Sequence, residues 1–375
     1  MKKQTIMNRQ KQLQALIREH NMGAVVLNPG PDLTYLTGLN FHLMERPVVG
    51  IFPGEGTPIL ILPELEGAKV ADLDYELTTY FYNEDQSTWT EAFYTALTGA
   101  GLEKAKVGAI PRHLRLLEIT FLKDACPDLD ILSGQDILKQ MRMIKGVDEI
   151  SHMDEAVRVA ECALSSIISS VKIGMTEKEL ASKLVGRLFY EGSESELPFF
   201  PIVSFGENSA NPHATPSDRD LRDGDLVLID WGASYQDYYS DICRTFKMGD
   251  ANPELEQIAQ FVLEANAAGR AAVKPGIPAS EVDFAARQVI EKSGYGEFFI
   301  HRTGHGLGRE SHEDPYISQF ESIILEPGMT FTIEPGIYLP GRGGVRIEDN
   351  VLVTEVGSRS ITSMPRDLSQ LLIEE

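Results

Sequence analysis

Two hydrophobic patterns alternate along the first third of the chain. Apolar residues recur at helical spacing across residues 7–21, and a short apolar run follows at residues 23–27. Further short apolar runs predict strands at residues 47–52, 58–62, 76–82 and 106–110. Helical patterns between these runs predict helices at residues 88–98 and 114–124. Helices and strands that alternate in this way are typical of an α/β layer domain.

The pattern changes after residue 135. Residues 136–172 are strongly helical, and a helix is expected at residues 176–191, where Thr176 and Glu179 have the spacing of a capping box. Two further helices are expected at residues 253–273 and 279–292. Strands are expected at residues 199–205, 225–235, 238–248, 329–338 and 345–355. We therefore expect an α/β domain at residues 1–135 and an α+β domain at residues 136–375, with residues 136–172 as linking helices.

Composition and charge narrow the class of protein. The 375 residues are 42% hydrophobic and 24% charged, which is typical of a globular protein. The net charge of −22 disfavours nucleic acid and anionic membranes as partners, because both attract basic surfaces. Three cysteines are too few for a disulfide framework, and the first residues lack the apolar core of a signal peptide. No apolar run reaches the roughly 18 residues that a membrane span needs, so we expect a cytoplasmic protein.

Two aspartates flank the first predicted hairpin of the second domain. Asp230 ends a very apolar strand, Leu-Val-Leu-Ile-Asp-Trp, and Asp241 follows eleven residues later. A tight turn around Tyr235 and Gln236 would place the two carboxylates directly opposite each other. Opposed like charges are destabilising, and a buried carboxylate is costly without a partner. A cation between the two aspartates would remove both costs.

Two glutamates repeat this arrangement near the end of the chain. Glu334 and Glu348 lie on either side of a segment rich in turn formers, Leu-Pro-Gly-Arg-Gly-Gly. A loop centred on Gly341 would place these two carboxylates opposite each other as well. One such pair has ordinary explanations, but two pairs in one domain point to bound metal.

Histidines supply the remaining candidate ligand. His305 lies between glycines in Gly-His-Gly-Leu-Gly, so that backbone and ligand can approach closely. His213, His301 and His312 lie within the same part of the sequence as His305. Four carboxylates and one imidazole suit two divalent ions such as manganese, cobalt or zinc. Two such ions about 3.5–4 Å apart can share one hydroxide as nucleophile and stabilise an oxyanion.

Five motifs in this order resemble those of a known family. They are Leu-Ile-Asp-x-Gly-Ala, Ser-Asp-x-x-Arg-Thr-Phe, Gly-His-Gly-x-Gly, Ile-Glu-Pro-Gly and Val-Arg-Ile-Glu-Asp. The chain resembles the pita-bread metallopeptidases, in the two-domain branch that contains Xaa-Pro dipeptidase (prolidase) and aminopeptidase P. The resemblance covers the whole chain. It implies a creatinase-type α/β N-terminal domain, a linking helix and an α+β pita-bread catalytic domain.

The resemblance assigns roles to individual residues. It implies five ligands of a dinuclear metal site, which are Asp230, Asp241, His305, Glu334 and Glu348. Glu334 would also handle the proton of the bridging water. The resemblance further implies a catalytic or substrate-binding role for a second group of residues, which are His213, His301, His312 and Arg346. Of these, His213 and His312 would act on the reacting carbonyl, and Arg346 would pair with a ligand carboxylate.

Two positions depart from the family pattern. Some prolidases carry an arginine directly after His-Glu-x-Pro, where it holds the free carboxylate of a dipeptide, and this chain has Tyr316 there. We include Tyr316 among the expected substrate-binding residues. Arg309 stands where the motif more often has an apolar residue. These departures leave open the choice between dipeptidase and aminopeptidase, and even the requirement for proline.

The leading hypothesis is hydrolysis of Xaa-Pro bonds at the N-terminus of short peptides by a metal-bridged hydroxide. One alternative is a family member that acts on a small non-peptide substrate. Another is a metal-free, creatinase-like relative, against which the presence of all five ligands argues. A methionine aminopeptidase shares the five ligands, but the additional N-terminal domain fits it poorly.

The resemblance also implies an assembly. In related dimers the region that corresponds to residues 36–46 lies near the active site of the partner. We therefore expect a homodimer in which His42 or Arg46 shapes the substrate pocket.

Overall fold

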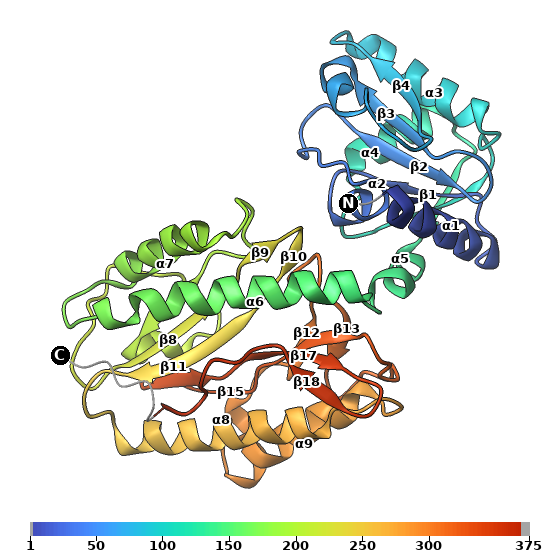
Figure 1. The fold of residues 1–375 in the computed structure, drawn as a ribbon. Coiled ribbons are helices and arrows are strands. Elements are labelled where there is room, and N and C mark those ends of the chain that lie inside the picture. The colour runs from blue at the N-terminus through green and yellow to red at the C-terminus, as the bar shows by residue number, and fades with distance from the viewer. Residues whose placement is uncertain (1–2, 369–375) are drawn as a thin grey trace. The chain divides into compact units, whose positions relative to one another are not determined.

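The computed structural model describes residues 3–368, and the chain divides into two compact units, residues 1–142 and 143–375 (Figure 1). The segment expected to link two domains, residues 136–172, spans this division. Its first helix, α5 (Gln135–Arg142), belongs to the first unit, and its second helix, α6 (Val147–Ile167), belongs to the second.

The first unit is built on one mixed six-stranded sheet. The strands follow the order β4 (Thr78–Tyr82), β3 (Ile59–Pro63), β2 (Val49–Pro53), β1 (Ala24–Leu27), β5 (Lys106–Ala109) and β6 (Asp130–Ser133). β1 runs parallel to β5 and antiparallel to β2. Besides α5, the helices of this unit are α1 (Lys3–Glu19), α2 (Pro31–Thr37), α3 (Trp89–Gly99) and α4 (Leu116–Ala125).

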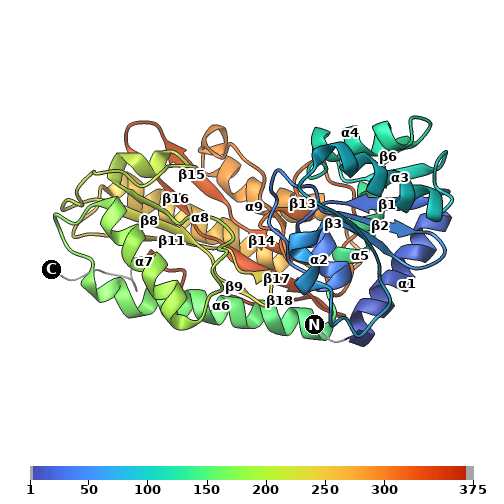
Figure 2. The same ribbon diagram turned by 90° about the horizontal axis from the view of Figure 1, so that it is seen from above.

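Helices cover both faces of this sheet, as the alternation of apolar residues predicts. Val26 packs in a cluster with residues of α3 and α4, whereas its neighbours Val25 and Leu27 pack in a second cluster with residues of α1, α2 and α5. Figure 2 shows these two groups of helices on opposite sides of the sheet. The α/β layer architecture expected for the N-terminal domain is confirmed.

Within residues 143–368, the second unit contains four long helices around a set of antiparallel strands. Besides α6, its helices are α7 (Glu177–Glu191), α8 (Pro253–Ala272) and α9 (Ala279–Lys292). One sheet has the order β11 (Ile242–Lys247), β8 (Leu226–Trp231) and β7 (Ile202–Phe205). A second has the order β13 (Glu313–Ile317), β12 (Gly304–Gly306), β14 (Thr330–Ile333), β17 (Asp349–Val353) and β18 (Ser358–Ser360). Two-stranded ribbons join β9 (Ser234–Tyr235) to β10 (Tyr238–Tyr239) and β15 (Gly336–Leu339) to β16 (Gly343–Arg346).

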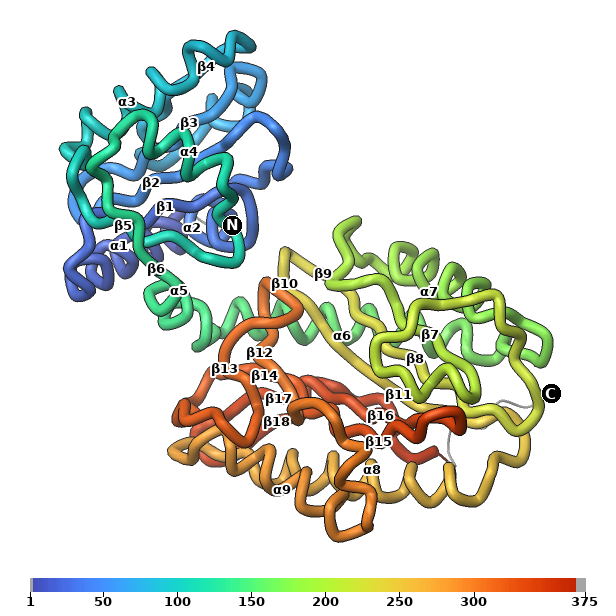
Figure 3. Tube along the Cα trace, turned by 180° about the vertical axis from the view of Figure 1, so that it is seen from behind, coloured from blue at the N-terminus to red at the C-terminus, as the bar shows by residue number. Residues whose placement is uncertain are grey.

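The strands of this unit lie between two pairs of helices. One apolar cluster joins α6 and α7 to β7, β8 and β11, and two others join α8 and α9 to β14 to β17. Figure 3 shows the strands between these helices from behind. The N-terminus of α7 is capped by Thr176, whose hydroxyl accepts from the Glu179 amide while Glu179 accepts from the Thr176 amide, so the predicted capping box is confirmed.

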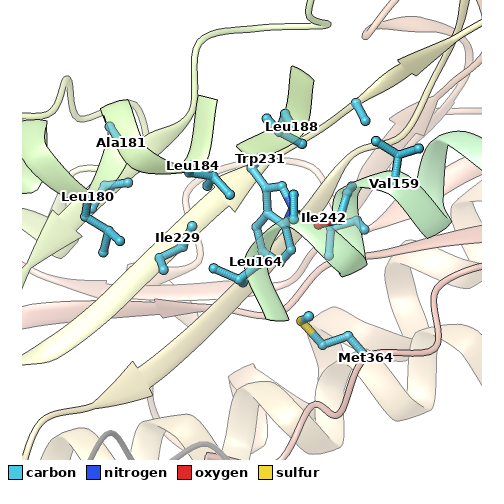
Figure 4. Close-up of a cluster of buried hydrophobic side chains, with 14 of the residues drawn as sticks. Val159, Leu164, Leu180, Ala181, Leu184, Leu188, Ile229, Trp231, Ile242 and Met364 are labelled. Atoms are coloured by element: carbon cyan, nitrogen blue, oxygen red, sulfur yellow. Dashed lines mark hydrogen bonds between the residues drawn. The ribbon is translucent and has the colours of Figure 1, made fainter. Parts of the chain in front are cut away.

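The largest side chain in this core fixes the orientation of the strand beside it. Trp231 is fully buried among residues of α6 and α7 (Figure 4), and its indole Nε1 donates to the Ala160 carbonyl at 2.9 Å. Ile229 lies in the same cluster. Because successive side chains of a strand point to opposite faces, Asp230 points away from these helices.

Several strands differ from their predicted bounds. The predicted strand at residues 329–338 is interrupted between β14 and β15 by Glu334 and Pro335, where proline has no N–H for the ladder. β12 was not predicted, because Gly-His-Gly lacks the alternating or β-branched residues that mark a strand. Among the described residues, no helix has the length and apolarity that crossing a membrane requires.

Candidate active site

The hairpin that carries the two aspartates closes one residue later than predicted. Its turn residues are Gln236 and Asp237, both with positive φ (52° and 62°), and the register pairs Asp230 with Cys243. The prediction that Asp230 and Asp241 lie directly opposite each other is therefore wrong. A shift of the turn by one residue moves the partner of Asp230 by two positions along the opposite strand. Because side chains alternate between faces, Asp230 and Asp241 stay on the same face of the sheet. The two carboxylates consequently remain diagonal neighbours.

The second hairpin has the predicted register. Gly336 pairs with Arg346 on one side of the glutamates, and Ile333 pairs with Asp349 on the other. Glu334 and Glu348 lie between these pairs, opposite each other, in a register centred on Gly341. The same register continues through both β14–β17 and β15–β16. This prediction is confirmed.

These elements bring the predicted ligands together with His305. Ligand atoms of Asp241, His305 and Glu348 all lie within 4.8 Å of one another, and all three side chains are buried. The Nε2 atom of His305 lies 3.3 Å from Oε1 of Glu334 and 3.6 Å from Oδ2 of Asp241. His305 therefore presents Nε2 to the carboxylates, while its Nδ1 lies 3.2 Å from the Gly306 carbonyl oxygen.

Close approach of backbone explains the glycines beside His305. A Cβ on Gly304 would lie 1.9 Å from the Thr332 carbonyl oxygen, and one on Gly306 would lie 2.3 Å from that of Asp314. Any larger residue at either position would push the neighbouring strand away. The glycines thus hold His305 deep between β13 and β14.

Two carboxylate oxygens in this cluster are buried without a hydrogen bond within the described part of the chain. They are Oδ1 of Asp230 and Oε1 of Glu348. The other oxygen of Asp230 accepts from Nη2 of Arg346. Buried polar atoms are almost always satisfied, so two unpaired oxygens aimed into one cluster fit a cation.

The electrostatics of the cluster lead to the same conclusion. Burial, and then the neighbouring carboxylates, raise the pKa of Asp241 and of Glu348 well above their usual range. Burial raises the pKa of Glu334 to about 8, and also raises that of Asp230 even though Arg346 opposes the shift. Four carboxylates that are hard to ionise together suit positive charge of more than one unit. The residues present therefore fit a divalent metal site.

A chain of hydrogen bonds leads away from Asp230. Arg346 donates from Nη1 to the Tyr338 hydroxyl at 2.8 Å, and this hydroxyl lies 2.8 Å from Nε2 of His301. Burial lowers the pKa of His301 to about 4, so its imidazole is neutral at physiological pH. Tyr338 was not identified from the sequence. The spacing of two residues from Gly336 along a strand could have placed it on the same face as the ligands.

The candidate residues surround one pocket of about 550 Å³ in the second unit. His213 and His312 are both exposed and line this pocket. The ring of His312 lies 3.9 Å, centre to centre, from that of His305. The wall also contains residues that were not identified from the sequence, which are the apolar Phe199, Phe200, Ile202 and Pro212 and the polar Arg302 and Ser311.

Tyr316, an expected substrate-binding residue, contacts a residue of the pocket wall but does not line the pocket itself. The residues that line the pocket include Arg302 but not Tyr316, and the Arg302 guanidinium stacks on the Tyr316 ring at 4.2 Å from its centroid. Arg302 was not identified from the sequence, although it directly follows His301. Arg309 is also buried, but it lies outside the pocket and donates to Asp237 in the hairpin turn at 2.7 Å.

Comparisons with known proteins cover nearly the whole chain. Residues 151–355 match the family described as Metallopeptidase family M24. Residues 9–144 match the Creatinase/Prolidase N-terminal domain. The first match covers more than half of the chain.

Individual relatives agree with these matches. The Xaa-Pro dipeptidase of Pyrococcus horikoshii is 36% identical over 366 residues, which are 97% of this chain and 99% of that protein. The probable dipeptidase PepE of Mycobacterium tuberculosis is 36% identical over 360 residues, which are 94% of this chain and 93% of that protein. The crystal structure of a prolidase from Thermococcus sibiricus has a TM-score of 0.92 and 35% identity, and covers 96% of this chain and 98% of that chain. The expected fold, a creatinase-type domain followed by a pita-bread catalytic domain, is confirmed.

Proposed function

This chain belongs to metallopeptidase family M24, and from that premise we propose that it is an Xaa-Pro dipeptidase, which cleaves the amide bond before the proline of a dipeptide. The names of the relatives support this assignment. The observation that carries it is the convergence on one pocket of His305, three buried carboxylates and the partly buried carboxylate of Glu334. Peptides with proline in the second position are the proposed substrates.

The proposed metal ligands are the five residues Asp230, Asp241, His305, Glu334 and Glu348. Two divalent ions, manganese, cobalt or zinc, would supply an activated water as nucleophile and positive charge for the substrate carbonyl oxygen. Arg346 would keep Asp230 ionised and oriented through its hydrogen bond to Oδ2. The carboxylate of Glu334, whose Oε1 lies 3.3 Å from Nε2 of His305 within the cluster, would accept the proton of the attacking water.

Two histidines are proposed to act on the reacting amide. His213 and His312 line the pocket and are not among the proposed ligands. Their imidazoles would donate to the carbonyl oxygen as it becomes negative in the tetrahedral intermediate. The leaving group of an Xaa-Pro bond is a secondary amine, which must be protonated as it departs. The proton that Glu334 accepts is available for this step.

The Arg302 guanidinium in the pocket supports a preference for dipeptides over longer peptides. Arg302 lines the pocket, its guanidinium is stacked on Tyr316, and Nη2 lies 3.4 Å from Nδ1 of His312. A guanidinium held in this way suits a substrate carboxylate. In a dipeptide the proline carries that carboxylate, whereas in a longer peptide it does not. Arg302 therefore takes the role that the arginine missing at position 316 has in some prolidases.

The assay that tests this proposal uses chelator-treated enzyme reloaded with Mn²⁺, Co²⁺ or Zn²⁺. Its substrates are Ala-Pro, Ala-Ala and Ala-Pro-Ala. We expect Ala-Pro to have the highest kcat/KM and the tripeptide to be cleaved far more slowly. Equal kcat/KM for Ala-Pro and Ala-Pro-Ala would assign an aminopeptidase P type activity instead. Failure to cleave any of the three with bound metal would contradict a peptidase specific for proline.

We further propose that the chain forms a homodimer. Leu43 and Met44, in the loop before β2, are about half exposed, and this places two apolar side chains on one surface loop. Burial of such side chains is a common contribution of a subunit interface. Sedimentation equilibrium of the purified protein measures the assembly. A fully active monomer would contradict the proposal.

A further inference from the structure

A buried ion pair lies outside the pocket and outside the proposed mechanism. The Nζ atom of Lys145 lies 2.6 Å from Oε1 of Glu313, and the two side chains are only 2% and 8% exposed. Neither residue lines the pocket. Removing two charges from water is costly, so a buried ion pair is weak evidence of a purely stabilising role. Its location suggests another role.

Glu313 is the first residue of β13 and directly follows His312. The ion pair therefore lies one residue away from a histidine whose ring is 3.9 Å, centre to centre, from that of the proposed ligand His305. Lys145 is itself held in place by its backbone, since its N–H donates to the Gly328 carbonyl at 2.9 Å and Ile144 pairs with Met329. Because the Lys145 backbone is held and its side chain is almost fully buried, the ammonium group can hold Glu313, the first residue of β13, in place.

The third glycine of the Gly-His-Gly-Leu-Gly motif makes room for this pair. A Cβ on Gly308 would lie 2.5 Å from Oε1 of Glu313 and 3.0 Å from Cε of Lys145. A residue larger than glycine would therefore displace the ion pair. The glycine motif that contains His305 thus also leaves space for the ion pair between Lys145 and Glu313, next to His312.

The His312 side chain is exposed, and its imidazole lies against the His305 ring, 3.9 Å between centres, with Nδ1 3.4 Å from Nη2 of Arg302. The position of the His312 backbone decides whether the imidazole can reach the rotamer that makes these contacts. We propose that Lys145 is a positioning residue, which holds Glu313 and thereby places the His312 imidazole at the edge of the ligand cluster. This inference rests on the proposed function, because it needs His312 to act in catalysis.

A double-mutant cycle between Lys145→Met and His312→Ala tests the inference. The readouts are kcat and KM for Ala-Pro, bound metal by mass spectrometry, and thermal stability. We expect Lys145→Met to lower kcat roughly 10-fold or more with metal content unchanged, and Lys145→Arg to restore most of the loss. In the His312→Ala background, Lys145→Met should lower kcat by less than about 2-fold, because the residue through which it acts is absent.

A matched control comes from the buried ion pair of the first unit. Nη1 of Arg142 lies 2.7 Å from Oδ1 of Asp32, with side-chain exposures of 8% and 6%. Arg142→Met should lower thermal stability as Lys145→Met does, but leave kcat at 25 °C unchanged. Glu313→Gln, which keeps the shape of the side chain, serves as the second variant if Lys145→Met does not fold, and should show the same coupling to His312→Ala.

The possible results separate the inference from the function on which it rests. If His312→Ala lowers kcat but Lys145→Met does not, the positioning role is wrong and the proposed function stands. Equal losses from Lys145→Met with and without His312 would also overturn the positioning role, because the pair would then act independently of His312. If His312→Ala leaves kcat unchanged, the catalytic role proposed for His312 is wrong, and the positioning role of Lys145, which acts through His312, is overturned with it.

Discussion

Arg346 donates a hydrogen bond from Nη2 to Oδ2 of Asp230, and both side chains are buried within the ligand cluster. The Arg346 guanidinium lowers the pKa of Asp230, although the larger effect of burial raises it. Without metal, this contact is the main compensation for Asp230. Its removal should therefore affect the metal-free protein most.

We expect Arg346→Met to lower the unfolding free energy of the metal-free protein by about 3 kcal/mol, since a buried charge loses its partner. Urea denaturation in the presence of a chelator measures this change. Arg342→Met is the matched control on the same hairpin, because Arg342 pairs with Glu254 at the surface and both side chains remain at least one-third exposed. Such a pair should contribute less than about 1 kcal/mol. Equal losses for the two variants would contradict the assigned role of Arg346.

The histidines should separate metal binding from chemistry. His305→Ala should lose metal and activity together, because Nε2 of His305 faces the carboxylates. His213→Ala and His312→Ala should keep their metal and lose about 100- to 1000-fold in kcat, the usual effect of removing one oxyanion donor. Metal stoichiometry measured alongside kinetics decides between these outcomes. Loss of metal from His213→Ala or His312→Ala would require a ligand set richer in histidine.

Stability in acid should depend on Asp32 in the first unit. Burial alone would raise its pKa, but the Arg142 charge and the hydrogen bond with His113 outweigh burial and lower the pKa below its usual value. A carboxyl with a lowered pKa stabilises the fold above its unfolded pKa and loses that contribution as pH falls through the folded pKa.

The measurement is the melting temperature of wild type and Asp32→Asn between pH 6 and pH 3. We expect the wild type to be more stable at pH 6 and the difference to shrink below about pH 4, where the aspartate of the unfolded chain is protonated. A difference that stays constant down to pH 3 would mean that the ionised form of Asp32 is not what stabilises this unit.

The two hairpins illustrate how far the sequence predicts this site. The loop at Gly341 has glycines and a proline that favour one register, and that register was predicted correctly. The turn at Gln236 and Asp237 has positive φ at both residues without glycine or asparagine, and aspartate alone is a weaker turn signal, so its exact position was not predicted. The ligand face was nevertheless correct, because the error moved the pairing by two positions.

The place of Arg302 in the pocket could not be predicted from turn residues or from strand periodicity. Its place in the pocket depends on stacking against Tyr316, which lies on another segment, in β13. Nothing in the local pattern around His301 indicates that the next side chain turns toward the ligands. Contacts of this kind depend on the packing of distant segments, whereas ligands at the ends of apolar strands follow from local periodicity.

Arg302 should decide the preference for dipeptides. If its guanidinium binds the proline carboxylate, Arg302→Met should raise KM for Ala-Pro by roughly 10- to 100-fold, since a charge-assisted hydrogen bond typically contributes about 1.5–3 kcal/mol. The same variant should have little effect on Ala-Pro-amide, which lacks the carboxylate. Arg309→Met is the matched control, because Arg309 is a buried arginine of the same segment that binds Asp237 outside the pocket.

Kinetics of wild type and both variants on the two substrates complete this test. Arg309→Met should leave the ratio of kcat/KM for Ala-Pro to that for Ala-Pro-amide unchanged, whereas Arg302→Met should reduce it by the factor by which KM rises. A loss that is equal for both substrates would mean that Arg302 supports the pocket in general, through His312 or Tyr316, rather than the carboxylate. A loss confined to Ala-Pro identifies the guanidinium as the group that selects a free carboxylate, because only the interaction present in one substrate can change the ratio.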